Sequence, residues 1–187
     1  MSKRTQHYLR FGLVLGGILA WTGLMLYVGP RTLVETIGVQ NGYLLMLLVS
    51  LFGGVSSIGG AVYVTTIITL ASAGLQPLYL ALASGIGVSV GDSVYYYLGY
   101  RGSHLLPSDG ALTKRIQYFS DWLQQQTQWL RATAIYGYTA FTPLPNDILT
   151  IVLGITRQPY LLVIPALVLG NITHTFLIAT VGQWLPF

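Results

Sequence analysis

Residues 63–99 read YVTTIITLASAGLQPLYLALASGIGVSVGDSVYYYLG, and residues 144–182 read LPNDILTIVLGITRQPYLLVIPALVLGNITHTFLIATVG. The two stretches align with two short slips, because an apolar run, a Gln-Pro pair and two glycines recur in the same order. The paired anchors are Ile67 with Ile148, Gln76 with Gln158, Gly87 with Gly170 and Gly99 with Gly182. Chance alignment of apolar segments is the alternative, but the glycines and the Gln-Pro pair are harder to match by accident. Many membrane transporters are built from duplicated halves around a central site, so the echo favours a transport architecture.

The composition is that of a membrane protein. Only 7% of the 187 residues are charged and 53% are hydrophobic, whereas a soluble domain carries about 25% charged residues. No charged side chain occurs between Glu35 and Asp92, and a bilayer span needs about 20 apolar residues. We therefore expect one all-α polytopic membrane domain over residues 1–187. The chain has no cysteine, which excludes disulfides and thiolate metal sites.

Segment lengths predict three full spans and two hairpins that re-enter the membrane from the face they left. The full spans are expected at residues 11–28, 78–99 and 160–184. Residues 42–74 are too many for one helix and too few for two spans, and glycines and serines interrupt their middle; residues 132–156 are again too few for two spans, and prolines interrupt theirs. Non-helical backbone at that depth is tolerated where it is buried in protein or faces water.

The domain is expected to divide into a first span, two repeats and a connector. The first span, residues 11–28, is too long for a signal-peptide core, so we interpret it as a retained helix. Repeat one covers residues 42–99, repeat two covers residues 132–184, and residues 100–131 form the connector. Within the connector, residues 111–131 are predicted to form an amphipathic helix on the cytoplasmic membrane surface.

The basic residues predict the orientation. With a cytoplasmic N-terminus, eight of the nine lysines and arginines lie inside and only Arg31 lies outside, as the positive-inside rule requires. Because the basic residues lie at the membrane edges, the net charge of +4 does not indicate binding of nucleic acid. The two hairpins then enter from opposite faces, so the echo becomes an inverted repeat in what we expect to be the cell (inner) membrane. Charge alone does not distinguish a hairpin from two crossings, because the assigned sides are the same.

Two motifs resemble one known family. Residues 91–102, GDSVYYYLGYRG, resemble the Gly-Asp…Tyr-x-x-Gly-Arg-x-x-Gly signature of the DedA family, also called the VTT or SNARE-associated membrane-protein family. Residues 141–146, FTPLPN, followed by Gly154 and Pro159-Tyr160, resemble the second hairpin of that family. The resemblance covers residues 42–184, which is nearly everything after the first span.

The resemblance implies two opposed re-entrant hairpins and a role in moving phospholipid or polyprenyl phosphate across the bilayer, with proton coupling in some members. This chain departs from the family pattern at the hairpin tips. The two tip arginines of the family are replaced by Ala140 and Asn146, and the acidic residue of the first hairpin is missing. Anion capture by arginine within the membrane is therefore not expected here.

Asp92 and Asp147 are the only acidic residues within predicted membrane segments. An intramembrane carboxylate costs about 2.5–3.5 kcal/mol on insertion scales and is a functional hypothesis by default. Asp92 is a candidate proton carrier or, alternatively, a structural partner of Tyr or Thr side chains. Pro143 and Pro145 set a turn, after which Asn146 or Asp147 could cap the returning half-helix. Asp147 is also a candidate contact for substrate or a coupling ion at the midplane.

The remaining candidates are neutral or basic. His174 is the only histidine in a predicted span and corresponds to the position beside Asp92, so it either relays protons or bonds a neighbouring helix. In the first hairpin the candidates are Ser56, Ser57, Thr65 and Thr66, with Thr66 aligned to Asp147. No metal site, cofactor or catalytic triad is expected from the spacing of the side chains.

The sequence therefore predicts lipid translocation by a flippase- or scramblase-like protein, with membrane lipids and protons as partners and no enzymatic activity. An ion- or proton-coupled transporter of a small solute is one alternative. A membrane chaperone or assembly factor that transports nothing is the other. The oligomeric state, a homo-oligomer included, is left open.

Overall fold

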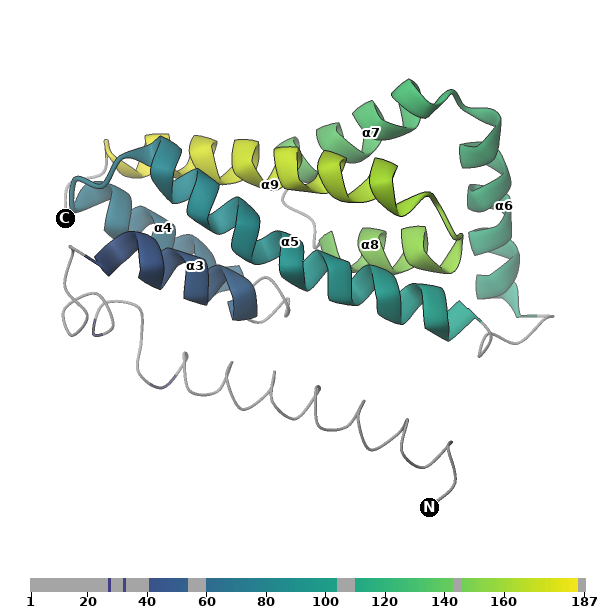
Figure 1. The fold of residues 1–187 in the computed structure, drawn as a ribbon, viewed down its shortest axis with the longest axis horizontal. Helices are drawn as coiled ribbons and strands as arrows, with labels where there is room; N and C mark the ends of the chain where they lie inside the picture. Colours follow the sequence, from purple (N-terminus) through teal and green to yellow (C-terminus); the bar gives the residue numbers. More distant parts are fainter. Residues whose placement is uncertain are drawn as a thin grey trace, which may run out of the picture.

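The computed structural model describes Tyr27, Thr32 and residues 41–53, 60–103, 110–142 and 146–184. The expected first span, residues 11–28, lies outside the described part apart from Tyr27. The predicted all-α fold is confirmed for the described residues, which form helices and no strands (Figure 1). The helices are α3 Gly42–Gly53, α4 Gly60–Ser72, α5 Pro77–Gly102, α6 Ala111–Gln125, α7 Gln128–Phe141, α8 Asn146–Ile155 and α9 Tyr160–Gly182.

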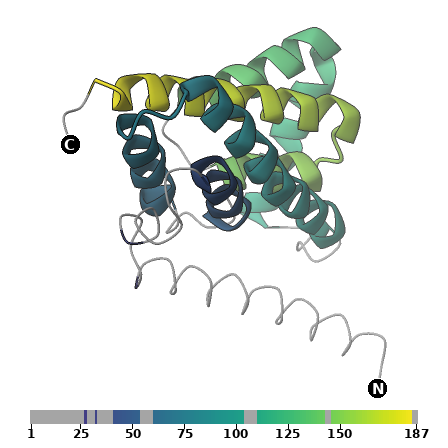
Figure 2. The ribbon, with the colours of Figure 1, turned by 60° about the vertical axis from the view of Figure 1, so that its left-hand side comes forward.

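Two long helices, α5 and α9, form the centre of the molecule. They have 26 and 23 residues and are long and apolar enough to cross a membrane. Proline begins both: Pro77 occupies the first turn of α5 and Pro159 is the N-cap of α9, where its missing N–H is not needed. Both views show α5 and α9 crossing while their chains run in opposite directions (Figures 1 and 2).

The exposed face of α5 is apolar, whereas its buried face carries small and polar residues. Every fourth residue from Leu78 to Val94 is a large apolar side chain that is at least 38% exposed. Its buried face instead carries small and polar residues, among them Ser84, Gly87 and Asp92. An exposed apolar stripe with polar groups inside is the distribution that a lipid environment favours.

The two halves of the chain are packed in the same manner. In α5, Gly87 lies against Leu47 and Ser50 of α3, and in α9 the corresponding Gly170 lies against Tyr136 and Thr139 of α7. Each long helix therefore packs against the first helix of its own half. A side chain at either glycine would overlap the facing helix, so both positions need the close approach that glycine permits.

The second helix of each half packs against the long helix of the other half. Gly99 of α5 meets the backbone of Ile151 in α8, and Gly182 of α9 meets the backbone of Ile68 in α4. We call the alignment that pairs Gly99 with Gly182 the contact register, and in it Ile68 pairs with Ile151. Such an exchange of equivalent contacts is the property of a twofold relation, so the halves form a repeat with approximate twofold symmetry.

The packing corrects the alignment of the two halves. The turns after α4 and α8 also follow the contact register, since Leu75 N–H bonds Leu70 C=O as Gln158 N–H bonds Leu153 C=O. The sequence alignment of the apolar runs and of the two Gln-Pro pairs is therefore wrong. That alignment paired residues of the same type, whereas equivalent positions in the structure are those that make the same helix contacts. The position equivalent to Asp147 is Val64 and not Thr66.

The connector also differs from the prediction. A single amphipathic helix was expected over residues 111–131, but α6 ends at Gln125 and α7 begins at Gln128. Thr127 explains the break, because its extended backbone and its hydroxyl, which accepts from Leu130 N at 3.3 Å, form an N-cap. Figure 1 shows α6 standing at one end of the molecule, where Leu123 is buried against α7 and α9.

Candidate functional site

A buried polar cluster joins α5, α8 and α9. The Asp92 side chain of α5 is 0% exposed, and its Oδ2 accepts a hydrogen bond of 2.7 Å from Asn171 Nδ2 of α9. Asn171 Oδ1 in turn accepts a bond of 2.9 Å from Asn146 Nδ2 of α8. The three side chains form a chain of hydrogen bonds that crosses between the two halves. We call Asp92, Asn171 and Asn146 the amide–carboxylate cluster.

The second oxygen of the carboxylate lacks a partner. Among the residues that the structure describes, Asp92 Oδ1 is buried and accepts no hydrogen bond. Thr150 of α8 faces the same carboxylate, but its hydroxyl donates to Asn146 C=O at 2.9 Å. An unpaired buried polar atom is costly.

Asp147 adds a second acidic group to this region. It lies in the first turn of α8, and its charge acts on both Asp92 and Tyr95. A second negative charge beside a buried carboxylate disfavours the binding of an anion there. The electrostatics of the cluster therefore do not suit capture of a phosphate.

The other half holds a hydroxyl cluster at the equivalent place. Tyr63 Oη of α4 lies 2.6 Å from both Ser84 Oγ of α5 and Thr175 Oγ1 of α9. In the contact register, Tyr63 corresponds to Asn146 and Thr175 corresponds to Asp92. Symmetry thus places two polar clusters between the halves. The cluster around Tyr63 consists of neutral hydroxyl groups, whereas the amide–carboxylate cluster contains a carboxylate.

His174 and the hydroxyl candidates lie elsewhere. His174 Nδ1 is 3.2 Å from Ala140 C=O of α7, so the histidine bonds a neighbouring helix rather than Asp92 in this arrangement. Thr66 is fully buried and donates to Val62 C=O within its own helix, whereas Thr65 is exposed on α4. The remaining four candidates, Ser56, Ser57, Pro143 and Pro145, lie outside the described residues.

The sequence analysis missed Asn171 and Thr150. A signal for Asn171 was present, since an amide within a predicted span must find a partner and an apolar run offers few. Thr150 carries no comparable signal, because threonine in a membrane helix commonly bonds its own backbone. Within the described residues no group of three potential metal ligands gathers. The cluster therefore offers one buried carboxylate oxygen rather than a transition-metal site.

Comparisons of the chain with protein-family models, curated proteins and solved structures find no match.

Proposed function

We propose that this protein translocates lipid across a bilayer, as a flippase- or scramblase-like transporter of the DedA type. In the proposal α3–α4 and α7–α8 are hairpins that re-enter the membrane from opposite faces, and α5 and α9 cross it. The first span is supplied by residues 11–28. The end of the molecule that carries Arg101, Arg131 and Arg157 faces the cytoplasm, because basic residues favour that side of the inner membrane.

The observation that carries the proposal is the reciprocal packing of the two halves. Contacts between Gly99 and Ile151 and between Gly182 and Ile68 exchange under the twofold relation, and inverted repeats of this kind are a common plan for transporters. The amide–carboxylate cluster lies at the junction between the halves. Because the carboxylates disfavour a phosphate nearby, Asp92 would act at this junction as a proton carrier and would not contact the headgroup.

The test is transbilayer exchange of labelled lipid in liposomes that contain the purified protein. We expect faster exchange of a phospholipid or a polyprenyl phosphate than in protein-free liposomes. Asp92→Asn should slow it at least tenfold, because the variant removes the buried charge while it keeps the shape of the side chain. Asp147→Ala should also slow exchange. Asp121→Asn makes the same charge change at an exposed position of α6 and should exchange lipid like the unaltered protein.

Failure of the protein to accelerate any of these lipids would refute lipid translocation. Normal exchange by Asp92→Asn, with exchange by the unaltered protein intact, would instead give the carboxylate a purely structural role. Absence of lipid exchange by the unaltered protein is the outcome that the assembly-factor alternative predicts.

A second candidate function is ion- or proton-coupled transport of a small solute. Asp92 Oδ1 favours it, since this buried carboxylate oxygen accepts no hydrogen bond from the residues that the structure describes, and an intramembrane carboxylate of that kind suits proton coupling. Vesicles that contain the protein would then change their internal pH when the solute is added. Such a pH change without lipid exchange would decide for this candidate and against the first.

A further inference from the structure

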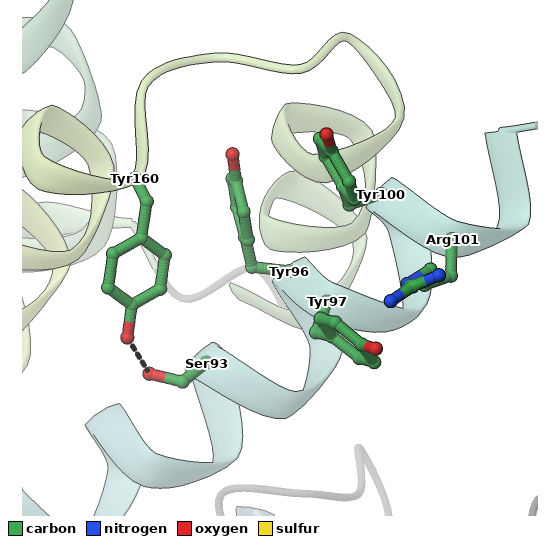
Figure 3. Close-up of a pocket in the computed structure, with 6 residues that line it drawn as sticks. All are labelled: Ser93, Tyr96, Tyr97, Tyr100, Arg101 and Tyr160. Atoms are coloured by element: carbon green, nitrogen blue, oxygen red, sulfur yellow. Dashed lines mark hydrogen bonds between the residues drawn. The ribbon is translucent and has the colours of Figure 1, made fainter.

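A pocket of about 420 Å³ lies along the C-terminal part of α5, from Ser93 to Arg101. Its volume is within the roughly 300–1,000 Å³ of small-molecule sites. Figure 3 shows Tyr160 reaching over from α9, with Tyr96 and Tyr100 projecting toward the connection between α8 and α9. The lining consists of four tyrosines, one serine and one arginine: Ser93, Tyr96, Tyr97, Tyr100, Arg101 and Tyr160. We call it the tyrosine pocket.

Hydrogen bonds and ring contacts hold the walls of the tyrosine pocket in place. Tyr96 Oη donates to Gln158 C=O, and the rings of Tyr96 and Tyr160 pack edge to face with centroids 5.4 Å apart. Tyr160 Oη and Ser93 Oγ are 3.1 Å apart across the opening (Figure 3). These contacts hold Tyr96, Tyr160 and Ser93, whereas Tyr97, Tyr100 and Arg101 are exposed at the surface.

Arg101 lines the tyrosine pocket, and Arg157 lies against the ring of Tyr100, which also lines it. Arg101 Cζ lies 5.1 Å from the centroid of the Tyr97 ring, and Arg157 Cζ lies 5.3 Å from that of Tyr100. No described carboxylate is within ion-pair distance of Arg101. The first turn of α9, which begins at Tyr160, adds the positive end of a helix dipole. The charge at the pocket thus suits an anion.

The other half of the molecule supplies an internal comparison. In the contact register, the six lining positions correspond to Phe176, Ala179, Thr180, Gln183, Trp184 and Pro77. None of these is a tyrosine or an arginine, although the same helices pack in the same way. The fold therefore does not require the tyrosines and the arginine.

Arg157 marks a further difference between the two halves. It is in the left-handed region with φ of 52°, and the equivalent residue in the other half is Gly74 with φ of 93°. Glycine is the residue that this conformation favours, and a side chain there is strained. The turn would form more easily with glycine at both positions. The backbone of the turn therefore gives no reason for a guanidinium at this position.

From these observations we propose that the tyrosine pocket binds the phosphate headgroup of an anionic amphiphile, with Arg101 and Arg157 on the phosphate and the tyrosine rings against the adjoining apolar chain. Guanidinium groups bind phosphate oxygens with two parallel hydrogen bonds. The two positive charges exclude a choline-type cation, which an aromatic cage alone would attract. The lipid identity of the ligand rests on the proposed function, but the binding step does not depend on transport.

The experiment measures equilibrium binding to the purified full-length protein in a neutral detergent. The probes are a short-chain phosphatidic acid, inorganic phosphate and a short-chain phosphatidylcholine, each titrated calorimetrically. We expect phosphatidic acid to bind at one site at least tenfold more tightly than either other probe. Arg101→Gln and Arg157→Gly should each weaken that binding at least tenfold. Arg115→Gln, an equal loss of charge at an exposed position of α6, should change it less than twofold.

Each other outcome overturns a defined part of the proposal. Equal weakening by Arg115→Gln would reduce the site to general surface charge. Inorganic phosphate binding as tightly as phosphatidic acid would show a free-phosphate site and not a lipid site. Arg157→Gly guards against misfolding, because glycine suits the backbone at this position. If binding fails while liposome exchange by the unaltered protein persists, the tyrosine pocket is refuted and lipid translocation is not.

Discussion

Replacing Gly154 by alanine tests the close approach of α5 and α8, on which the twofold relation of the halves depends. A Cβ at Gly154 would overlap the backbone oxygen of Tyr96 and would lie 2.9 Å from the backbone nitrogen of Tyr100. These are backbone atoms of a neighbouring helix, so no side chain can rotate away to make room. The added methyl group must therefore push α8 away from α5.

Two opposing effects set the size of the change. Alanine is favoured over glycine in a helix by about 1 kcal/mol, whereas overpacking in a tight interior costs about 1–3 kcal/mol. The overlap at Gly154 involves backbone on the facing side, which places the cost near the upper end. We expect a net loss of about 2 kcal/mol, which for a chain of this size lowers the unfolding midpoint by roughly 4–8 °C.

The assay is thermal unfolding of the purified protein in detergent, followed by the fraction that remains monodisperse after heating. Gly137→Ala in α7 is the matched control, because no atom lies within 4 Å of the Cβ it would add. That variant gains helix propensity without overlap, so its midpoint should rise by roughly 2 °C. If both variants shift in the same direction, or if Gly154→Ala leaves the midpoint unchanged, the close packing of α5 on α8 is wrong.

Further variants test the cluster, the turn and the helix cap by the same thermal assay. Asn171→Leu removes the hydrogen-bond partner of Asp92 and Asn146 and should lower the free energy of unfolding by about 3 kcal/mol or more. Asn171→Leu should destabilise the protein less when Asp92→Leu is already present. If the effects of the two substitutions simply add, the direct bond between Asn171 and Asp92 is contradicted. Arg157→Gly should stabilise by about 1 kcal/mol, since relief of about 1–3 kcal/mol of backbone strain exceeds the lost ring contact, whereas Arg157→Ala should destabilise. Thr127→Ala removes the N-cap of α7 and should cost about 1 kcal/mol, and a loss of equal size in the exposed Thr133→Ala would argue against a cap.

The sequence predicted the helices well because apolar length and proline positions are local signals. Pro77 and Pro159 marked the starts of α5 and α9 closely. The end of α6 was missed, since Thr127 acts as an N-cap only through a backbone bend that no local apolar pattern reveals. The re-entrant geometry of the hairpins and the orientation in the membrane stay predictions.

The sequence predicted the charged residue of the candidate site but not the residue that bonds to it. Asp92 was found because a carboxylate in an apolar span is costly wherever its partners lie. Its bond to Asn171 joins residues 79 positions apart, and only the packing of α5 on α9 brings them together. The alignment of the halves failed for a related reason. Alignment by residue type paired Thr66 with Asp147, whereas the helix contacts pair Val64 with Asp147.

The exchange of helices between the halves has a consequence for biosynthesis. Tyr63 is translated early, but its partner Thr175 follows 112 residues later. At about 5–20 residues per second, the ribosome needs roughly 5–20 s to reach it. During that interval the hydroxyl of Tyr63 and the groove that receives Gly182 wait without their final neighbours. The contacts between α4 and α9 therefore form last, after the rest of the first half has been made.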